Sequence, residues 1–224
     1  MRGYYSQKLS AERLKLCYEI APPRVRRYLE AEIEFVLDRI EPSALVLELG
    51  CGYGRVLKKL VAKAKAVVGI DTSHDSLLLA REMIGDRPFC HLFEMNAIEL
   101  GFHNGQFDMV ICIQNGISAF RVDQGKLIEE AMRVTRSGKK VLFSSYSERF
   151  WEDRIEWFRI QSDHGLIGEI DYDATGDGVI VCKDGFRAST VGPDDFISLT
   201  SDFDMVPTIT EVDDSSIFCE IPVG

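Results

Sequence analysis

The feature that most constrains the fold is a glycine-rich segment at 48–54, which reads Glu-Leu-Gly-Cys-Gly-Tyr-Gly. An almost continuously apolar run at 44–49, typical of a buried parallel strand, leads into it, and the stretch at 55–64 has the apolar periodicity of a helix. A glycine-rich turn between strand and helix lets a ligand approach the backbone and presents the free amides of the helix start. Glu48 adds a carboxylate at the end of the buried strand, where a ligand amine is a natural partner for it. The segment therefore predicts an α/β fold with a ligand site at this turn.

The spacing of the three glycines separates two classes of cofactor. Dinucleotide-binding folds use G-x-G-x-x-G, which would place the third glycine at position 55, where this chain has Arg55. The glycines instead fit E/D-x-G-x-G-x-G, and in this the chain resembles the class I S-adenosylmethionine-dependent methyltransferases. The resemblance implies that Glu48 lies near the methionine amine of the cofactor. It also implies that three glycines line the methionine end: Gly50, Gly52 and Gly54.

Three later segments resemble the same family in the same order, so that the resemblance covers residues 25–150. The run at 67–71 resembles the second strand, which implies that Asp71 binds both ribose hydroxyls of the cofactor. Residues 94–97 resemble the segment that contacts adenine, and residues 101–112 resemble the loop and fourth strand. The resemblance implies further cofactor contacts at the ends of these segments: Thr72, Asn96, Ala97 and Ile113.

Strands and helices alternate through most of the chain, which predicts a parallel sheet covered on both faces. The expected strands lie near 44–49, 66–70, 88–94, 107–114 and 139–146, and the expected helices near 54–64, 74–85 and 123–136. The resemblance implies a Rossmann-like, doubly wound α/β sheet of seven strands in the order 3-2-1-4-5-7-6. An antiparallel pair at 205–221 would complete this sheet.

Two segments stand outside this alternation. Residues 1–40 predict two N-terminal helices, which Pro22 and Pro23 separate. Residues 148–190 predict a helix and a hairpin inserted after the fifth strand. Insertions at this place commonly form a lid over the substrate pocket in the family. We therefore expect residues 1–224 to form a single methyltransferase domain that includes both segments.

The methyl acceptor should bind beyond the ends of the fourth and fifth strands, because ligands of open parallel sheets lie at the carboxyl ends of the strands. Gln114, Asn115 and Tyr146 are the candidates to contact it, although Asn115 also fits a turn residue or helix cap. The motif N/D-P-P-Y, which amino-methyltransferases of DNA or of protein glutamine carry after the fourth strand, does not occur there. This favours a small-molecule acceptor.

Several residues outside the sheet are further candidates. Arg187 and Arg154, both in the insertion, could bind an acceptor carboxylate, or could pair with nearby aspartates instead. His164 follows the predicted lid helix and could reach the pocket. Tyr4 or Tyr5 could cover the cofactor, with an ordinary exposed or core tyrosine as the alternative. The sequence assigns no catalytic base.

Charge and cysteine content limit the partners. The formal net charge is −10, and between Asp163 and Asp214 there are 13 acidic and two basic residues. An acidic chain repels phosphate backbones, so we expect no nucleic-acid substrate. The six cysteines form no C-x-x-C pair, so no metal site is expected. Residues 1–9 lack the apolar core of a signal peptide and no stretch is apolar enough to cross a bilayer, which predicts a cytoplasmic protein without membrane association.

These observations predict S-adenosylmethionine-dependent methyl transfer to a small-molecule acceptor by in-line displacement. Two alternatives stay open. The chain could methylate tRNA or a protein, with the basic residues at 24–27 as its docking surface. It could also be a cofactor-binding module without catalysis. The acceptor, the acceptor atom and the oligomeric state are left open by the sequence.

Overall fold

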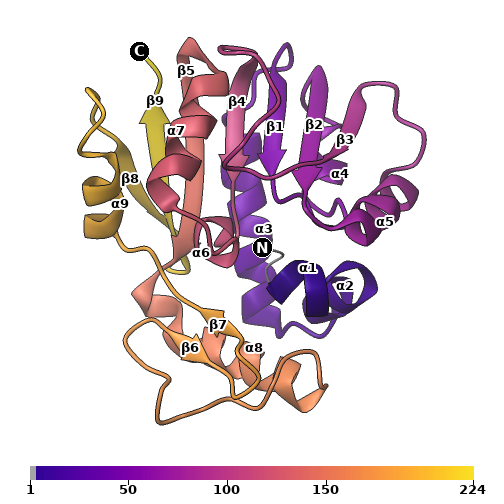
Figure 1. Ribbon diagram of the computed structural model, residues 1–224, viewed down its shortest axis with the longest axis vertical. Helices are drawn as coiled ribbons and strands as arrows, with labels where there is room; N and C mark the ends of the chain where they lie inside the picture. The colour runs from indigo at the N-terminus through magenta and orange to yellow at the C-terminus, as the bar shows by residue number, and fades with distance from the viewer. Residues whose placement is uncertain (1–3) are drawn as a thin grey trace.

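The computed structural model describes residues 4–224, apart from the side chain of Ser6, and is built on a seven-stranded sheet (Figure 1). The strand order is β3-β2-β1-β4-β5-β9-β8, with β1 to β5 parallel and β9 antiparallel to both its neighbours. This confirms the predicted order. The strands are β1 (Leu45–Leu49), β2 (Ala66–Asp71), β3 (Cys90–Glu94), β4 (Phe107–Cys112), β5 (Thr135–Tyr146), β8 (Thr208–Val212) and β9 (Ser216–Pro222).

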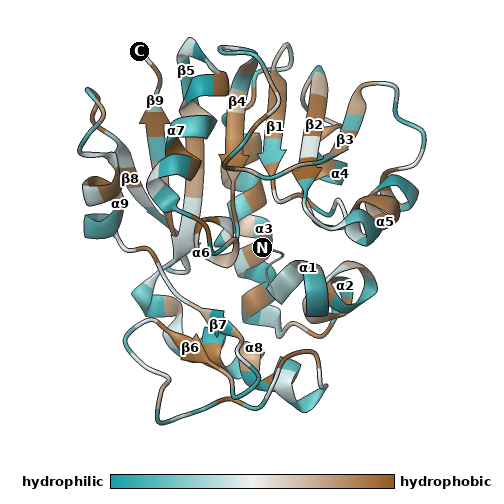
Figure 2. Ribbon diagram, viewed as in Figure 1, coloured by the Kyte–Doolittle hydropathy of each residue, from teal (hydrophilic) through white to brown (hydrophobic). Residues whose placement is uncertain are grey.

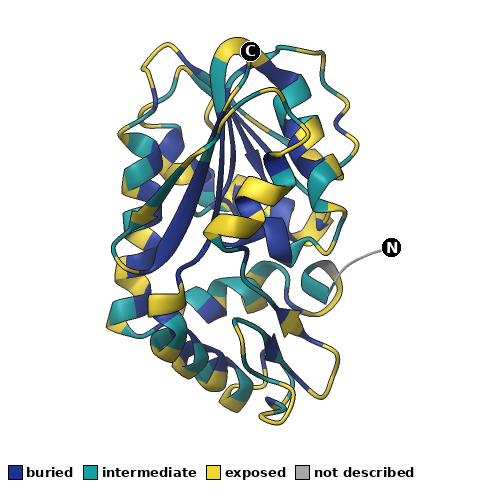
Figure 3. Ribbon diagram, turned by 90° about the vertical axis from the view of Figure 1, so that its left-hand side faces the viewer, coloured by how far each residue is buried: buried dark blue, intermediate teal, exposed yellow. Residues whose placement is uncertain are grey.

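Helices cover both faces of the sheet, as the alternation predicts. One face packs against α7 (Gln124–Val134) and α9 (Pro193–Thr200), and the other against α3 (Pro23–Leu37), α4 (Leu57–Leu60) and α5 (His74–Ile84). The central strands are hydrophobic and buried between these layers, whereas the helices carry the exposed residues (Figures 2 and 3). The sheet core therefore follows from apolar strands matched to amphipathic helices.

The helix expected at 54–64 is much shorter than predicted. Only Leu57–Leu60 is α-helical, and turns precede and follow it. Leu57 and Leu60 still pack against the sheet, so the apolar periodicity correctly indicated which residues face the core. Like charges four residues apart, such as those of Lys59 and Lys63, disfavour a longer helix in this stretch.

Helix starts agree with the sequence. The Ser73 side chain accepts a hydrogen bond from the backbone amide of Ser76 and so caps α5. Pro23 occupies the first turn of α3, where its missing amide proton costs no hydrogen bond. The chain therefore turns between α2 (Ala11–Glu19) and α3 at the predicted place.

The N-terminal helices and the insertion pack on each other beyond the carboxyl ends of the strands (Figure 1). The insertion consists of a 3-10 turn, η1 (Glu148–Phe150), the helix α8 (Trp151–Asp163) and the hairpin β6 (Ile180–Val181) and β7 (Arg187–Ala188). With α1 (Tyr4–Lys8), α2 and the start of α3 it forms a third apolar cluster, separate from the two on the sheet. In the described chain, none of the helices combines the length and the apolarity that crossing a bilayer requires.

Close packing of α4 on β2 depends on Gly69. A Cβ atom at this position would lie 2.5 Å from Leu57 Cδ1 and 2.9 Å from Cys51 Sγ, both buried. We expect Gly69→Ala to lower the free energy of unfolding by about 1–3 kcal/mol, because the core must shift to admit the methyl group. Urea denaturation measures this. Gly101→Ala, where the nearest side-chain atom would lie at an ordinary 3.5 Å, is the matched control and should change stability little; equal effects of the two substitutions would contradict the packing argument.

Candidate active site

The carboxyl ends of β1, β2, β4 and β5 adjoin a cavity of about 340 Å³. This lies within the range of about 300–1,000 Å³ that is usual for small-ligand pockets. Residues at the strand ends form one wall, and residues of α1, α2, α3, α5, α6 (Gly116–Ala119) and α8 contribute to the others. Most of the residues predicted from the sequence line this one cavity: Glu48, Gly50, Gly52, Asp71, Thr72, Asn96, Ala97, Ile113, Gln114 and Tyr146. Their individual roles stay predictions.

Glu48 brings a buried carboxylate to the cavity wall. The residue is 4% exposed, and its Oε2 atom has no hydrogen-bond partner among the described residues. Burial raises the pKa of Glu48 to about 8, while the guanidinium of Arg55 acts in the opposite direction. A desolvated carboxylate without a protein partner is suited to binding a cationic group of a ligand.

Arg55 also belongs to the site, although the sequence indicated only that it replaces the third glycine of a dinucleotide motif. Its guanidinium carbon lies 4.6 Å from the centroid of the Tyr18 ring, and its Nη2 atom is buried without a hydrogen-bond partner in the described chain. The side chain lines the same cavity as Glu48. Its position depends on α2 packing over the glycine loop, a long-range contact that local periodicity does not reveal.

Asp71 ties the glycine loop to β2. Its Oδ2 atom accepts a hydrogen bond from the backbone amide of Gly52 at 2.9 Å, and its Oδ1 atom accepts one from that of Ser73 at 2.8 Å. Burial raises the pKa of Asp71, and these amide hydrogen bonds oppose the shift. Because a carboxylate offers about four acceptor positions, Asp71 keeps the capacity to bind ligand hydroxyls.

Two of the glycines serve packing within the protein. A Cβ atom on Gly50 would lie 2.4 Å from the Phe120 ring, which itself lines the cavity. Gly54 is not among the residues that line the cavity, and its place in the cofactor site stays a prediction. Its φ of +83° is one that side chains rarely adopt, and a Cβ atom there would lie 3.1 Å from Ala80 Cβ on α5. Gly54 therefore allows the loop to pack against α5.

The turn after β4 adopts an unusual conformation that Glu32 holds in place. Gln114 and Asn115 have φ values of +57° and +63°, in the left-handed region. The amide of Gln114 donates to Glu32 Oε2 at 2.7 Å and to Ser144 Oγ at 2.8 Å. Glu32 is fully buried, and burial raises its pKa to about 7. The sequence offered one signal for this role, because Glu32 falls on the apolar stripe of its helix beside Ile33.

Asn115 does not face the cavity, which corrects its prediction as an acceptor contact. Its Nδ2 atom donates to the carbonyl of Ser189 at 3.0 Å, and its Oδ1 atom accepts from Ser145 Oγ at 2.8 Å. It stands at the start of α6 (Gly116–Ala119) and is buried. The side-chain nitrogen and oxygen of Asn115 are thus both bonded within the protein, which fits the alternative that Asn115 is a turn residue.

Aromatic side chains line the part of the cavity away from the glycine loop. Tyr146, at the end of β5, lies 5.5 Å from Tyr28 between ring centroids, and Trp157 lies 5.6 Å from Phe158 on α8. The Trp157 indole donates to the carbonyl of Cys17 at 2.9 Å, which fixes the ring. Tyr5 also lines the cavity, and the prediction that it covers the cofactor stays open.

The candidate cations of the insertion do not reach the cavity. Arg187 is exposed on β7, and neither arginine is among the lining residues, which corrects both predictions of a carboxylate clamp. Arg154 is 1% exposed and donates to the carbonyls of Gly178 and Ala188, and its Nε atom has no hydrogen-bond partner in the described chain. His164 lies at the exposed end of α8, where its Nδ1 atom is 2.8 Å from the Ile160 carbonyl oxygen.

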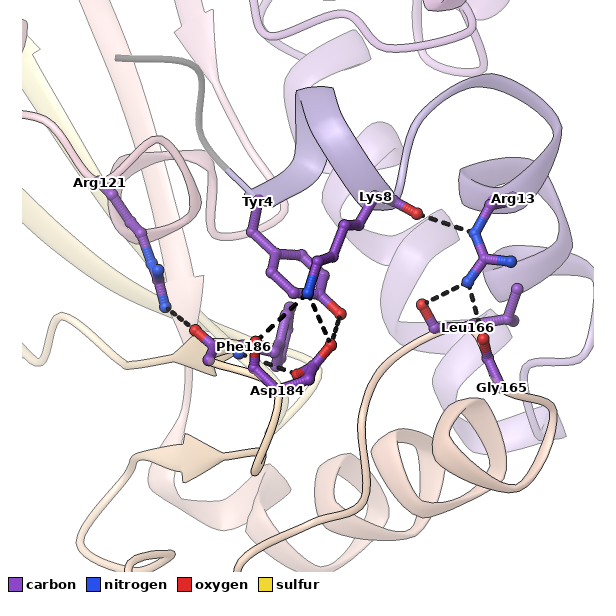
Figure 4. Close-up of polar contacts among 9 residues, drawn as sticks. Tyr4, Lys8, Arg13, Arg121, Gly165, Leu166, Asp184 and Phe186 are labelled. Carbon is purple, nitrogen blue, oxygen red and sulfur yellow. Dashed lines mark hydrogen bonds and ion pairs between the residues drawn. The ribbon is translucent and has the colours of Figure 1, made fainter.

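Polar contacts join the N-terminal helices to the insertion over the cavity (Figure 4). The Tyr4 hydroxyl donates to Asp184 Oδ2 at 2.6 Å, and Lys8 Nζ lies 3.4 Å from the same oxygen. Arg13 donates to the carbonyl of Gly165 at 2.7 Å. Arg121 donates to the Gly185 carbonyl at 3.1 Å. The two segments that enclose the cavity are therefore bonded to each other as well as to the sheet.

A family model described as a methyltransferase domain matches residues 46–138. The match runs from β1 into β5 and contains the glycine loop, Asp71 and the turn after β4. Residues 46–138 therefore form a methyltransferase domain, of the kind found in the class I S-adenosylmethionine-dependent enzymes. This confirms the family that the glycine spacing suggested.

The curated relatives match this chain over only part of their own length. A 2-methyl-6-phytyl-1,4-hydroquinone methyltransferase of Synechocystis is 26% identical over 60% of this chain and 47% of its own length. A phosphatidylethanolamine N-methyltransferase of Cereibacter sphaeroides is 35% identical over 46% of this chain and 51% of its own length. The chain thus spans about half the length of these two relatives.

Solved structures share the fold over nearly the whole chain. A magnesium protoporphyrin IX methyltransferase from Synechocystis, with S-adenosylhomocysteine bound, is 16% identical and covers 99% of this chain and 97% of its own, with a TM-score of 0.66. A protein from Pyrococcus horikoshii is 21% identical, with a TM-score of 0.67 and coverage of 91% and 92%. These likenesses confirm the Rossmann-like fold of the methyltransferase.

The two buried carboxylates should make the methyltransferase less stable as the pH rises. The pKa values of Glu32 and Glu48 are raised from 4.5 to about 7 and about 8. Below pH 4.5 both carboxyls are protonated in the folded and unfolded chain. Between pH 4.5 and 8 the unfolded chain loses protons that the folded chain keeps, so the free energy of unfolding falls, by at most about 1.4 kcal/mol per pH unit for each group.

Urea denaturation at several pH values between 5 and 8 tests this prediction. The double variant Glu32→Gln and Glu48→Gln should have a markedly flatter pH dependence than the natural protein. Glu34→Gln, on the exposed side of the same helix α3, is the control and should keep the original slope. An unchanged slope in the double variant would show that other groups cause the pH dependence.

Proposed function

We propose that the protein transfers a methyl group from S-adenosylmethionine to a small-molecule acceptor, and that both bind in the one cavity described above. The observation that carries this proposal is the division of the cavity wall. Its charged residues, Glu48, Arg55 and Asp71, lie on the glycine loop or at the ends of β1 and β2, whereas Tyr146, Trp157 and Phe158 come from β5 and α8. Such a cavity can hold a charged cofactor beside a less polar acceptor.

The charged end fits the cofactor. Glu48 Oε2 and Arg55 Nη2 are buried atoms without hydrogen-bond partners in the described chain, and no ion pair of the described residues joins the two side chains. The two groups carry opposite charges once Glu48 has lost its proton, which a bound ammonium favours. The amino-acid end of S-adenosylmethionine carries an ammonium and a carboxylate, which complement this pair. We assign the ribose hydroxyls to Asp71, and the adenine to Asn96 and Ala97, as the family resemblance implies.

When bound, S-adenosylmethionine supplies an electrophilic methyl group on a sulfonium sulfur. The residues of the chain then have to place the acceptor lone pair in line with that methyl group and exclude water. Orientation of this kind can contribute roughly 7–11 kcal/mol to lowering the barrier. Burial raises the pKa of Tyr146 and of Tyr28, so both phenols stay protonated at neutral pH and can donate hydrogen bonds to an acceptor.

The named relatives support a small acceptor, because two of them are methyltransferases of a hydroquinone and of a phospholipid. The net charge of −10 argues against a polyanion such as tRNA. We further propose that residues 148–190 act as the lid within one domain of residues 1–224. Its helix α8 contributes Trp157, Phe158 and Gln161 to the wall of the cavity.

Asp71→Ala should weaken the binding of S-adenosylhomocysteine at least about tenfold, because each charge-assisted hydrogen bond to a ribose hydroxyl contributes roughly 1.5–3 kcal/mol. Isothermal titration calorimetry measures the dissociation constant, and circular dichroism checks that the variant is folded. Asp75→Ala, at an exposed position on α5, is the matched control. An unchanged dissociation constant for Asp71→Ala would remove this residue from the proposed site.

The transfer itself is tested with S-adenosylmethionine that carries a radioactive methyl group. We expect label to appear in molecules of a metabolite extract and in neither tRNA nor protein extracts. Label confined to tRNA or protein would contradict the small-molecule acceptor. Binding of the cofactor without transfer to any extract would favour the non-catalytic alternative, and failure to bind it would reject the proposal.

A further inference from the structure

We propose that the methyl acceptor is an uncharged aromatic molecule whose polar substituent pairs with the side-chain amide of Gln161. This inference rests on the function proposed above and assigns a chemical class to its unknown substrate. Three features of the cavity support it: the shape of its aromatic walls, the absence of charge along them, and two neutral polar groups that have no partner in the described protein.

The aromatic walls come from three elements that converge beyond β4. Tyr28 lies on α3, Tyr146 ends β5, and Trp157 and Phe158 lie on α8. Tyr28 and Tyr146 are tilted by 43° to each other with centroids 5.5 Å apart, and both pack on Phe150. These rings are buried, so they present fixed faces and edges to the cavity. Flat aromatic molecules gain offset or edge-to-face contacts against such walls.

This part of the wall carries no charge among the described residues. The charged lining residues are Glu48, Arg55 and Asp71, and all three lie on the glycine loop or next to it. Arg154 lies behind this wall, with its guanidinium carbon 4.3 Å from the centroid of the Tyr146 ring; it is not a lining residue and donates to two backbone carbonyls, while its Nε atom has no partner in the described chain. A carboxylate or ammonium on the acceptor would be desolvated here with no lining residue of opposite charge to pair with it, which disfavours its binding.

Two neutral polar groups in the wall lack partners within the described chain. Gln161 is 3% exposed and lines the cavity, and no hydrogen bond of the described residues involves its side-chain amide. The Tyr28 hydroxyl is fully buried and has no partner. Buried polar groups are nearly always hydrogen-bonded in folded proteins, so these two point to a ligand that completes them. An amide and a hydroxyl each donate and accept, which suits a neutral substituent.

Calorimetry with protein saturated with S-adenosylhomocysteine tests the class of acceptor. We expect para-hydroxybenzamide to bind at least tenfold more tightly than para-hydroxybenzoate or para-hydroxybenzylamine, which differ from it mainly in charge. It should also bind more tightly than cyclohexanecarboxamide, which has the amide but no aromatic ring. Equal or tighter binding of a charged or a non-aromatic probe would overturn the inference, as would the failure of para-hydroxybenzamide to bind at millimolar concentration.

A variant of Gln161 tests the assigned contact. Gln161→Leu keeps a side chain of similar size, and we expect it to weaken the binding of para-hydroxybenzamide about five- to tenfold without changing the dissociation constant of S-adenosylhomocysteine. Glu156→Gln, at an exposed position on the same helix, should change neither value. Unchanged probe binding in Gln161→Leu would overturn the contact. If the natural protein does not bind S-adenosylhomocysteine, the proposed function fails and this inference fails with it.

Discussion

The buried carboxylate of Glu32 links the three elements that shape the cavity. One oxygen accepts hydrogen bonds from the Gln114 amide at 2.7 Å and from Ser144 Oγ at 2.8 Å, so α3, the turn after β4 and β5 are bonded at one point. Each of these elements also contributes to the cavity wall, with Tyr28 from α3, Gln114 from the turn and Tyr146 from β5. Because the turn adopts a left-handed conformation that ordinary residues rarely take, it needs such a fixed partner to persist.

The topology places the two acidic residues of the cavity on one side of it. Parallel strands end at one edge, so Glu48 and Asp71, which lie at the ends of neighbouring strands, are on the same side of the site. The far side is built by the N-terminal helices and the insertion, which bring Tyr28, Trp157 and Phe158 to it. A charged and an uncharged ligand can thus bind next to each other while each is desolvated against matching surface.

Much of the sheet could be predicted because its signals are local. The apolar runs that end near Glu48 and Asp71 and the glycine-rich turn each depend on a few adjacent residues, and they lie where the sequence placed them. Site residues that arise from long-range packing were missed. Arg55 and Gln161 face the cavity only because α2 and α8 lie over it, whereas Arg187 is directed to the surface by the same topology. Residue type alone could not separate these cases.

The insertion and the N-terminal helices, which enclose the cavity, are joined by strong apolar contacts and by weak polar contacts. Trp157 and Phe186 belong to a buried aromatic cluster, which holds the insertion to the N-terminal helices by apolar contact. The polar contacts of Lys8 and Arg13 with the insertion are exposed, where ion pairs and hydrogen bonds contribute little because water competes for them. Separation at these exposed contacts costs far less free energy than disrupting the aromatic cluster. The aromatic cluster, rather than the exposed polar contacts, therefore holds the insertion against the N-terminal helices.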